Sequence, residues 1–243
     1  MNSAEYARMY EAEERQWWYA GMRAISLALL APELPRGKLA FLDAGCGTGV
    51  NLALLGRLGA AFGVDISEEA IAFCRSRGVV AARGSVLELP VKSATVDAVT
   101  SFDVLYHRWV TDDLRAVREM ARVLRPDGLL LVRVPAFKLL WGAHDAAVHS
   151  RHRYTRGELE ALLAHAGLTL LRSSYANSFL FPLLLARRTL DRVLGRHGSD
   201  VGFLPAPLEW GFRSLLELEA WLIGRGVSLP IGASLFALAR KDG

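Results

Sequence analysis

Three glycines and two acids form the part of the sequence best suited to hold a nucleotide-like ligand. Asp43 is followed by Gly45, Gly47 and Gly49, and Asp65 lies 20 residues after Gly45. Glycines at a turn between a strand and a helix let the backbone approach a ligand closely, and an acid at the end of the next strand can accept both ribose hydroxyls. The spacing therefore predicts a site for a cofactor that contains adenosine.

The same loop argues against two common cofactor classes. A dinucleotide-binding loop would have glycines at 45, 47 and 50, but residue 50 is Val50. No Gly-Lys-Ser/Thr follows the loop, which excludes a phosphate-binding P-loop. Asp43 would repel a phosphate, whereas a carboxylate suits a cationic amino group. The residues favour a cationic cofactor with an amino-acid tail.

A second set of polar and aromatic residues lies in the long connection 135–154. Its histidines and one aspartate could ligate a metal, but the neighbouring arginines would repel a cation, so we expect no metal here. The arginines would instead attract an anionic acceptor, such as a carboxylate or a phosphate; a solvated basic loop is the alternative. The members of this set are Trp141, His144, Asp145, His149, Arg151, His152, Arg153 and Tyr154.

Other residues that could do chemistry stand near the predicted strand ends. His107 follows the apolar run 96–102 and is a candidate base or acceptor ligand, with a turn cap as the alternative. Cys46 lies in the glycine loop, but no motif places a His or Asn partner near it, so we interpret it as a small packing residue. Trp18 and Tyr19 follow Trp17, and three consecutive aromatic residues cannot face one way on a helix. We therefore expect Trp18 or Tyr19 to contact a ligand or the insertion, with core packing as the alternative.

Short apolar runs alternate with helical stretches from residue 39 onward, which is typical of a parallel α/β sheet. Helix starts are marked by Ser67, by Thr111 to Asp113, and by Thr155 with Glu158 in a capping box. Helical patterns cover 3–30, 178–196 and 207–224. The predicted strands are 39–44, 60–65, 78–83, 96–102, 128–134, 168–174 and 233–240.

These elements predict one domain with an N-terminal helical cap in residues 1–35. The core would comprise 36–175 and 229–243, and a helical insertion, 176–228, would precede the last strand. The insertion is more apolar than a solvated hairpin needs, so it could roof an acceptor pocket, form a dimer face or rest on a membrane surface.

The sequence Asp-Ala-Gly-Cys-Gly-Thr-Gly from 43 to 49, followed by Asp65, resembles the first two motifs of class I S-adenosylmethionine-dependent methyltransferases. The resemblance continues in 84–107 and 122–135, in the order and spacing of that family's third to fifth strands. It covers about residues 39–171 plus the final strand. It implies a Rossmann-like fold with a seven-stranded, mostly parallel sheet, helices on both faces, and S-adenosylmethionine as cofactor.

The resemblance also implies roles for individual residues. The three glycines would cradle the methionine part, Asp65 would bind the ribose hydroxyls, and Phe102 and Asp103 would face the methionine amino group and the methyl donor. The family commonly has Asp where this chain has Ser85. The full set expected to bind cofactor is Tyr19, Arg23, Asp43, Gly45, Cys46, Gly47, Thr48, Gly49, Asn51, Asp65, Ile66, Ser85, Val86, Leu87, Phe102 and Asp103.

The implied reaction is methyl transfer to an oxygen or nitrogen. The acceptor would be a small or lipid-linked metabolite, anionic or partly apolar. A peptide carboxylate as acceptor, or a regulator that binds the cofactor without catalysis, are the alternatives. The strand end at Phe102 lacks the Asn/Asp-Pro-Pro-aromatic sequence of enzymes that methylate nucleic-acid bases or glutamine. Candidate catalytic residues are His107, His149 and His152, and candidate acceptor-binding residues are Tyr106, Trp141, Arg151, Arg153 and Tyr154.

The composition is that of a globular protein. The chain has 243 residues, 52% of them hydrophobic, and only two cysteines, which excludes intrinsic disorder and a disulfide scaffold. The net charge of +4 comes mainly from arginine and is not accompanied by a nucleic-acid-binding signature, so we expect no nucleic-acid partner. The apolar run 179–186 is far shorter than the roughly 20 residues of a membrane span. We expect a bacterial, cytoplasmic protein, a monomer or homodimer, with peripheral membrane contact left open.

Overall fold

A seven-stranded sheet forms the centre of the structure, a computed structural model that describes residues 3–194 and 204–243. The strand order is β3-β2-β1-β4-β5-β7-β6, and all neighbours pair in parallel except β7, which is antiparallel to both β5 and β6. This confirms the predicted Rossmann-like α/β class. The strands are β1 (Ala40–Ala44), β2 (Ala60–Asp65), β3 (Ala81–Arg83), β4 (Val96–Phe102), β5 (Leu124–Pro135), β6 (Leu168–Ala176) and β7 (Ser234–Lys241).

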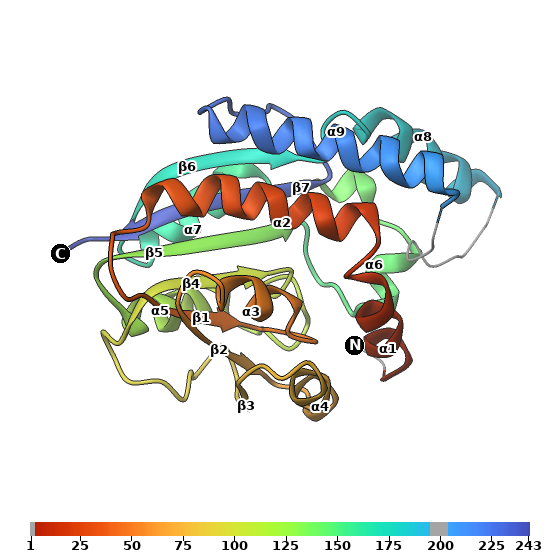
Figure 1. Ribbon diagram of the computed structural model, residues 1–243. Helices are drawn as coiled ribbons and strands as arrows, with labels where there is room; N and C mark the ends of the chain where they lie inside the picture. The colour runs from red at the N-terminus through yellow and green to blue at the C-terminus, as the bar shows by residue number, and fades with distance from the viewer. Residues whose placement is uncertain (1–2, 195–203) are drawn as a thin grey trace.

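Helices cover both faces of the sheet (Figure 1). Helices α2 and α9 pack with each other and with one face through Phe41, Leu131 and Phe236, whereas α5 and α7 pack on the other face. The helices are α1 (Ser3–Ala12), α2 (Trp17–Leu30), α3 (Val50–Leu55), α4 (Glu68–Ser76), α5 (Asp113–Val123), α6 (Ala143–Ala147), α7 (Arg156–His165), α8 (Phe181–Leu194) and α9 (Ala206–Gly224), with short 3-10 helices η1 (Ala31–Glu33) and η2 (Lys138–Leu140).

Three helix starts follow the predicted caps. The Ser67 hydroxyl accepts the Ala70 N–H, and the Asp112 carboxylate accepts the Arg115 N–H. Thr155 forms the predicted capping box at the start of α7. Each cap satisfies backbone N–H groups that the first helical turn leaves without partners.

The topology brings the loops that follow several strands to one edge of the sheet. Strands β1, β2, β4 and β5 run in parallel, and β6 has the same direction because β7 is antiparallel to both of its neighbours. The glycine loop, Asp65, Asp103 and Asn177 therefore all lie at the carboxyl edge. Ligands of open α/β sheets bind at this edge.

The structure differs from the sequence prediction in two connections. The stretch 3–30 is two helices, because the chain turns at 13–16 and α1 folds back onto α4, where Tyr10 stacks on Phe73 with ring centroids 4.9 Å apart. The connection 135–154 contains η2 and α6, and a parallel bridge between Ala136 and Tyr154 closes it. The insertion contains α8 and α9 at nearly the predicted positions; residues 195 and 196 lie outside the described part of the chain.

Helices α2 and α9 approach each other closely at Gly21. A Cβ at this position would lie 2.3 Å from Leu216 Cδ1 and 2.4 Å from Leu216 Cβ. One turn away, Trp17 meets Phe212 edge to face with centroids 5.2 Å apart. Helices α2 and α9 thus form one packed layer.

Candidate functional site

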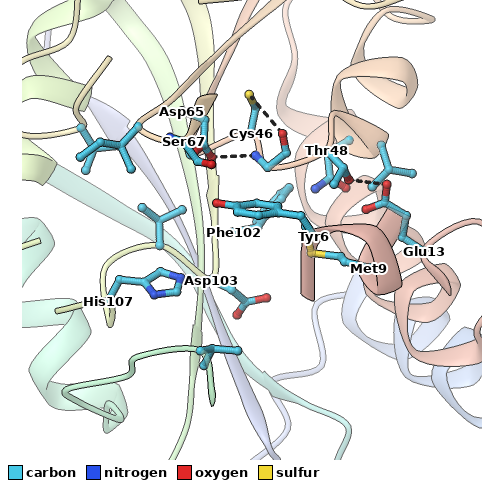
Figure 2. Close-up of a pocket in the computed structure, with 18 of the residues that line it drawn as sticks. Tyr6, Met9, Glu13, Cys46, Thr48, Asp65, Ser67, Phe102, Asp103 and His107 are labelled. Carbon is cyan, nitrogen blue, oxygen red and sulfur yellow. Dashed lines mark hydrogen bonds between the residues drawn. The ribbon is translucent and has the colours of Figure 1, made fainter. Parts of the chain in front are cut away.

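A cavity of about 510 Å³ lies at the carboxyl edge of the sheet (Figure 2). Its wall combines the glycine loop, the segments that follow β2, β3 and β4, and side chains from α1 and α2. Most of the residues expected to bind cofactor line it: Tyr19, Arg23, Gly45, Cys46, Gly47, Thr48, Asn51, Asp65, Ile66, Ser85, Val86, Phe102 and Asp103.

Gly45, the first glycine of the loop, has no room for a side chain. Gly45 has φ +85°, and a Cβ there would lie 2.2 Å from Val104 Cγ2. Its N–H donates to the carbonyl of Val64 at 2.7 Å, which ties the loop to the end of β2. The loop backbone can therefore turn beneath a ligand only when residue 45 carries no side chain.

Asp65 connects the loop to the end of β2. One carboxylate oxygen accepts the Gly47 N–H and the other accepts the Ser67 N–H, both at 2.9 Å. The carboxylate is nearly buried, and this burial raises its pKa. Each carboxylate oxygen has a second lone pair, so Asp65 can hold the loop and also accept hydroxyl groups of a ligand.

Three residues expected to bind cofactor do not line the cavity among the described residues: Asp43, Gly49 and Leu87. Asp43 lies beneath the loop, where it accepts the Thr100 hydroxyl at 2.6 Å, and burial raises its pKa to about 7. A Cβ on Gly49 would point at Cys74 and Val79 instead of at the cavity. Asp43 and Gly49 therefore lie on the side of the loop away from the cavity, and direct contact of Asp43, Gly49 and Leu87 with the cofactor stays a prediction.

Asp103 ends β4 and carries an ion pair with Arg133 of β5. Arg133 Nε donates to Asp103 Oδ2 at 2.9 Å, and its guanidinium lies 4.9 Å from the Trp18 ring and 5.1 Å from the Phe102 ring. Asp103 itself has φ +57°, an uncommon backbone conformation for a residue other than glycine. Sequence analysis missed Arg133, although a charged residue within the apolar run 128–134 was a signal for it.

Sequence analysis missed three further residues of this cavity: Tyr6 and Met9 of helix α1, and Glu13 in the turn directly after it. Figure 2 shows the Tyr6 ring reaching into the pocket, and its hydroxyl interacts with the Ser67 side chain. Burial and the nearby Asp65 carboxylate raise the pKa of Tyr6. The three positions recur at helical spacing, so one face of α1 covers this cavity.

Glu13 fastens this helix to the glycine loop. Its Oε1 accepts the Thr48 hydroxyl and an N–H of Arg77, the latter at 2.5 Å. Burial raises the pKa of Glu13 to about 7, against the opposing effects of Thr48 and Arg77. The protonation state of one carboxyl group is therefore linked to the contact between the end of α1 and the glycine loop.

The pH dependence of stability should change in the variant Glu13→Gln. Because the folded pKa is raised from 4.5 to about 7, the folded state binds more protons than the unfolded state between these values. This group's contribution to stability is thus present at pH 4.5 and is lost as the pH rises through 7. We expect the wild-type chain to lose about 2 kcal/mol or slightly more relative to Glu13→Gln between pH 5 and 7.5, measured by urea denaturation. Parallel stability curves for the two proteins would contradict this account.

His107 lines the first cavity, as the sequence predicts for a candidate base. Burial lowers its pKa to about 4, although a hydrogen bond with the Val148 backbone opposes the shift. Its ring stacks on Tyr106 at 4.5 Å, and its Nδ1 has no hydrogen-bond partner within the described chain. The imidazole is therefore neutral at pH 7, the form that can accept a proton.

We expect the His107 imidazole to remain neutral down to about pH 5 in an NMR titration of the folded protein. Because the folded pKa lies below the usual 6.5, the unfolded state binds this proton more readily. This group's contribution to stability is therefore lost as the pH falls from 6.5 towards 4. A midpoint near 6.5 for this residue would contradict the burial-based assignment.

The structure does not assemble the expected anion site in 135–154. Arg151 pairs with Asp113, and Arg153 forms a buried ion pair with Asp145 in which Nε and Oδ1 are 2.7 Å apart. The Tyr154 hydroxyl donates to Asp113 at 2.6 Å. These contacts fix the connection against α5, so we revise Arg151 and Tyr154 from acceptor binding to a structural role.

The remaining candidates of this connection are dispersed. His149 packs edge-on against Trp109, and His152 Nε2 lies 3.6 Å from a Glu158 carboxylate oxygen. Within the described residues His149, His152 and Trp141 lie outside both cavities, and the side chain of His144 lies outside the described part of the structure. We therefore no longer expect His149 or His152 to be catalytic.

In 3–194 and 204–243 no group of three or more His, Cys, Asp or Glu side chains is placed to hold a metal.

A second cavity, of about 480 Å³, adjoins the first beneath α8 and α9. Tyr106 lines both cavities, and Arg153 lines the second. Asn177, which follows β6, is also in its wall; it is buried, has φ +56°, and its Oδ1 has no partner among the residues described. The buried Glu219 of α9 accepts the N–H groups of Ser178 and Phe179 and so fixes the backbone beside Asn177.

Over the described ranges, no helix is both long and apolar enough to cross a membrane.

Residues 42–132 match the methyltransferase domain family. A probable S-adenosylmethionine-dependent methyltransferase of Mycobacterium tuberculosis is 38% identical over 131 residues, which are 52% of this chain and 47% of that protein. A mouse tRNA (carboxymethyluridine(34)-5-O)-methyltransferase is 33% identical over 127 residues, 51% of this chain and 18% of that protein. This chain spans about half the length of the mycobacterial relatives that it matches.

The fold is shared with solved structures over nearly the whole chain. A crystal structure of an S-adenosylmethionine-dependent methyltransferase from Thermotoga maritima superposes with a TM-score of 0.61 at 19% sequence identity, covering 98% of this chain and 95% of that one. At this identity the likeness establishes the architecture alone. The sequence match and the architecture together support the resemblance drawn from the glycine loop.

Proposed function

We propose, from the premise that residues 42–132 form a class I S-adenosylmethionine-dependent methyltransferase domain, that this protein transfers a methyl group from S-adenosylmethionine to an oxygen or nitrogen of a small, partly apolar acceptor. The observation that carries the proposal is the juxtaposition of the glycine loop with Asp65 in a cavity of about 510 Å³. That volume lies within the range of small-molecule sites.

The residues around the first cavity fit the parts of this cofactor. Asp65 offers carboxylate oxygens to the ribose hydroxyls, and Ile66 presents an exposed apolar side chain beside the expected adenine position. Arg23, whose guanidinium donates to the Glu13 carbonyl at 2.6 Å, supplies positive charge for the carboxylate of the amino-acid tail. Asp103 supplies negative charge for its amino group.

S-adenosylmethionine supplies a methyl group on a sulfonium, so its leaving group is already activated and the protein mainly aligns donor and acceptor. Asp103 and Tyr106 line both cavities and therefore stand where the two ligands would meet. A base is needed only for an acceptor that arrives protonated. We assign that task to His107, because it lines the first cavity beside Tyr106 and its imidazole is neutral at pH 7; its lowered pKa makes it a weak base.

The second cavity favours a small or lipid-linked acceptor. Its wall is largely apolar, and of the arginines that line it Arg153 pairs with Asp145 and Arg187 with Asp191. Nucleic-acid sites, by contrast, present positive charge along the phosphate backbone. The mouse relative acts on tRNA according to its name, so tRNA is the first macromolecule to include in an acceptor screen. The same screen should include a peptide with a free carboxylate. If no acceptor gives turnover, the protein is a regulator that binds the cofactor without catalysis.

The cofactor assignment is tested by calorimetry with S-adenosylmethionine, S-adenosylhomocysteine and NAD. We expect micromolar dissociation constants for the first two and no measurable binding of NAD. Tighter binding of NAD would overturn the proposal. An acceptor screen with the labelled methyl donor then distinguishes an enzyme from a regulator, since only an enzyme gives turnover.

A further inference from the structure

The two cavities are connected through shared walls. Trp18 and Tyr19 of α2, together with Asp103 and Tyr106 after β4, line both. A molecule in the second cavity therefore has one end beside Asp103, at the entrance to the proposed cofactor site. The rest of that molecule would lie among the helices of the N-terminal cap and the insertion.

The wall of the second cavity is largely apolar, with side chains from α2, α8 and α9, and Arg187 and Arg188 of α8 also line it. Leu183 and Leu208 line it although their side chains are 57% and 48% exposed. Exposed apolar side chains gathered around a hollow are characteristic of ligand-binding grooves. The main apolar contributors are Trp17, Leu180, Leu183, Leu184, Leu208 and Phe212.

The carboxylates in this wall already hold cations. Asp103 pairs with Arg133, and Asp145 pairs with Arg153 in a buried contact. Asp145 is thus neutralised within the protein, and Asp103, which also lines the first cavity, is assigned above to the amino group of the cofactor. Among the described residues, neither carboxylate of this wall therefore calls for a charged acceptor. Asn177 offers one buried carbonyl oxygen that lacks a partner within the described residues, which can accept a single hydrogen bond from an otherwise apolar molecule.

We propose that the second cavity binds the uncharged apolar body of the methyl acceptor, which is therefore an amphiphile. Its body is an alkyl, isoprenoid or aromatic group, and its hydroxyl or amino group lies beside Asp103 and Tyr106. This inference rests on the proposed function for the identity of the reaction, and on the shared wall of the two cavities for the orientation of the acceptor.

A series of straight-chain 1-alkanols, from hexanol to dodecanol, tests this inference in the protein saturated with S-adenosylhomocysteine. Each buried methylene contributes about 0.8 kcal/mol, so we expect the dissociation constant to fall about three- to fourfold per carbon until the cavity is full. Isothermal titration calorimetry gives each constant. Affinity that does not change with chain length would overturn the inference.

Leucine-to-tryptophan variants then locate the site. Leu184→Trp on α8 and Leu208→Trp on α9 fill the cavity from two sides and should each weaken dodecanol binding at least tenfold. Leu190 is also on α8, is 53% exposed, and lies outside the cavity among the described residues; Leu190→Trp is therefore the matched control and should leave binding unchanged. Equal losses in all three variants would contradict the assignment.

The binding of S-adenosylhomocysteine by itself separates this inference from the proposed function. A wild-type chain that fails to bind S-adenosylhomocysteine contradicts the proposed function. A chain that binds S-adenosylhomocysteine but shows a flat alkanol series contradicts only the amphiphilic acceptor. Leu208 is half exposed, so Leu208→Trp should fold even if Leu184→Trp does not, and it then tests the site by itself.

Discussion

Replacing Gly45 by alanine is expected to abolish measurable cofactor binding and to destabilise the fold by roughly 3 kcal/mol or more. Two costs combine at this position. The backbone has φ +85°, which disfavours every residue with a Cβ, and the new methyl group would lie 2.2 Å from Val104 Cγ2. Val104 is short and branched, so the loop itself must move. Urea denaturation gives the change in stability, and calorimetry with S-adenosylhomocysteine gives the loss of binding.

Gly226 provides the matched control. Its φ is +91°, close to that of Gly45, but nothing lies within 4 Å of a Cβ built there. Gly226→Ala should therefore show only the backbone cost, about 1–2 kcal/mol, with unchanged cofactor affinity. Equal effects of the two variants would mean that the contact with Val104 does not determine the loop.

Asp65→Ala is expected to weaken S-adenosylhomocysteine binding by roughly 1.5–3 kcal/mol, about ten- to a hundredfold or slightly more. The variant removes the proposed acceptor for the ribose hydroxyls. It also leaves the Gly47 and Ser67 N–H groups without the carboxylate that holds them at 2.9 Å. The loss should therefore appear in both cofactor affinity and thermal stability, which calorimetry and a thermal melt measure separately.

Two comparisons make the Asp65 result specific. Asp65→Asn keeps one acceptor oxygen but turns an amide towards the backbone N–H groups, so it should fall between the wild type and Asp65→Ala. Within the described part of the chain the Ser85 hydroxyl accepts the Leu87 N–H, and Ser85→Ala should lower affinity by less than Asp65→Ala. Similar losses for Ser85→Ala and Asp65→Ala would show that the adenosine is bound in another way.

The strands could be predicted because their signal is local. Each is a short apolar run bounded by turn residues, and all seven were located within a few positions. The larger differences lie at strand starts: β5 begins at Leu124 and not at 128, and β3 begins at Ala81 and not at 78. Those limits depend on pairing with a neighbouring strand, as the register shift between Val96 and Ala98 shows, and sequence pattern does not contain the neighbour's register.

The cofactor-binding residues that belong to one sequence motif could be predicted. Those that come from elements far apart in the sequence were harder to predict. Asp65 and the glycines lie within one strand-turn-helix unit, so their spacing is informative. Tyr6 comes from α1 and Glu13 from the turn after it, and the position of both depends on the packing of this segment against α4. The arginines of 135–154 suggested an anion site because their partners, Asp113 and Asp145, cannot be identified from composition.

The contact of Gly21 with Leu216 limits how this scaffold can be recombined. Because α2 and α9 interlock at that point, and because Trp17 and Phe212 from these helices line the same cavity, neither helix is an independent module. A chimera that receives only the insertion of a related protein would place a foreign α9 against the native α2 and disturb both the joint and the pocket. Residues 17–30 and 206–224 must therefore be exchanged together, and with α8, which lines the same pocket, although most of the chain separates α2 from α9.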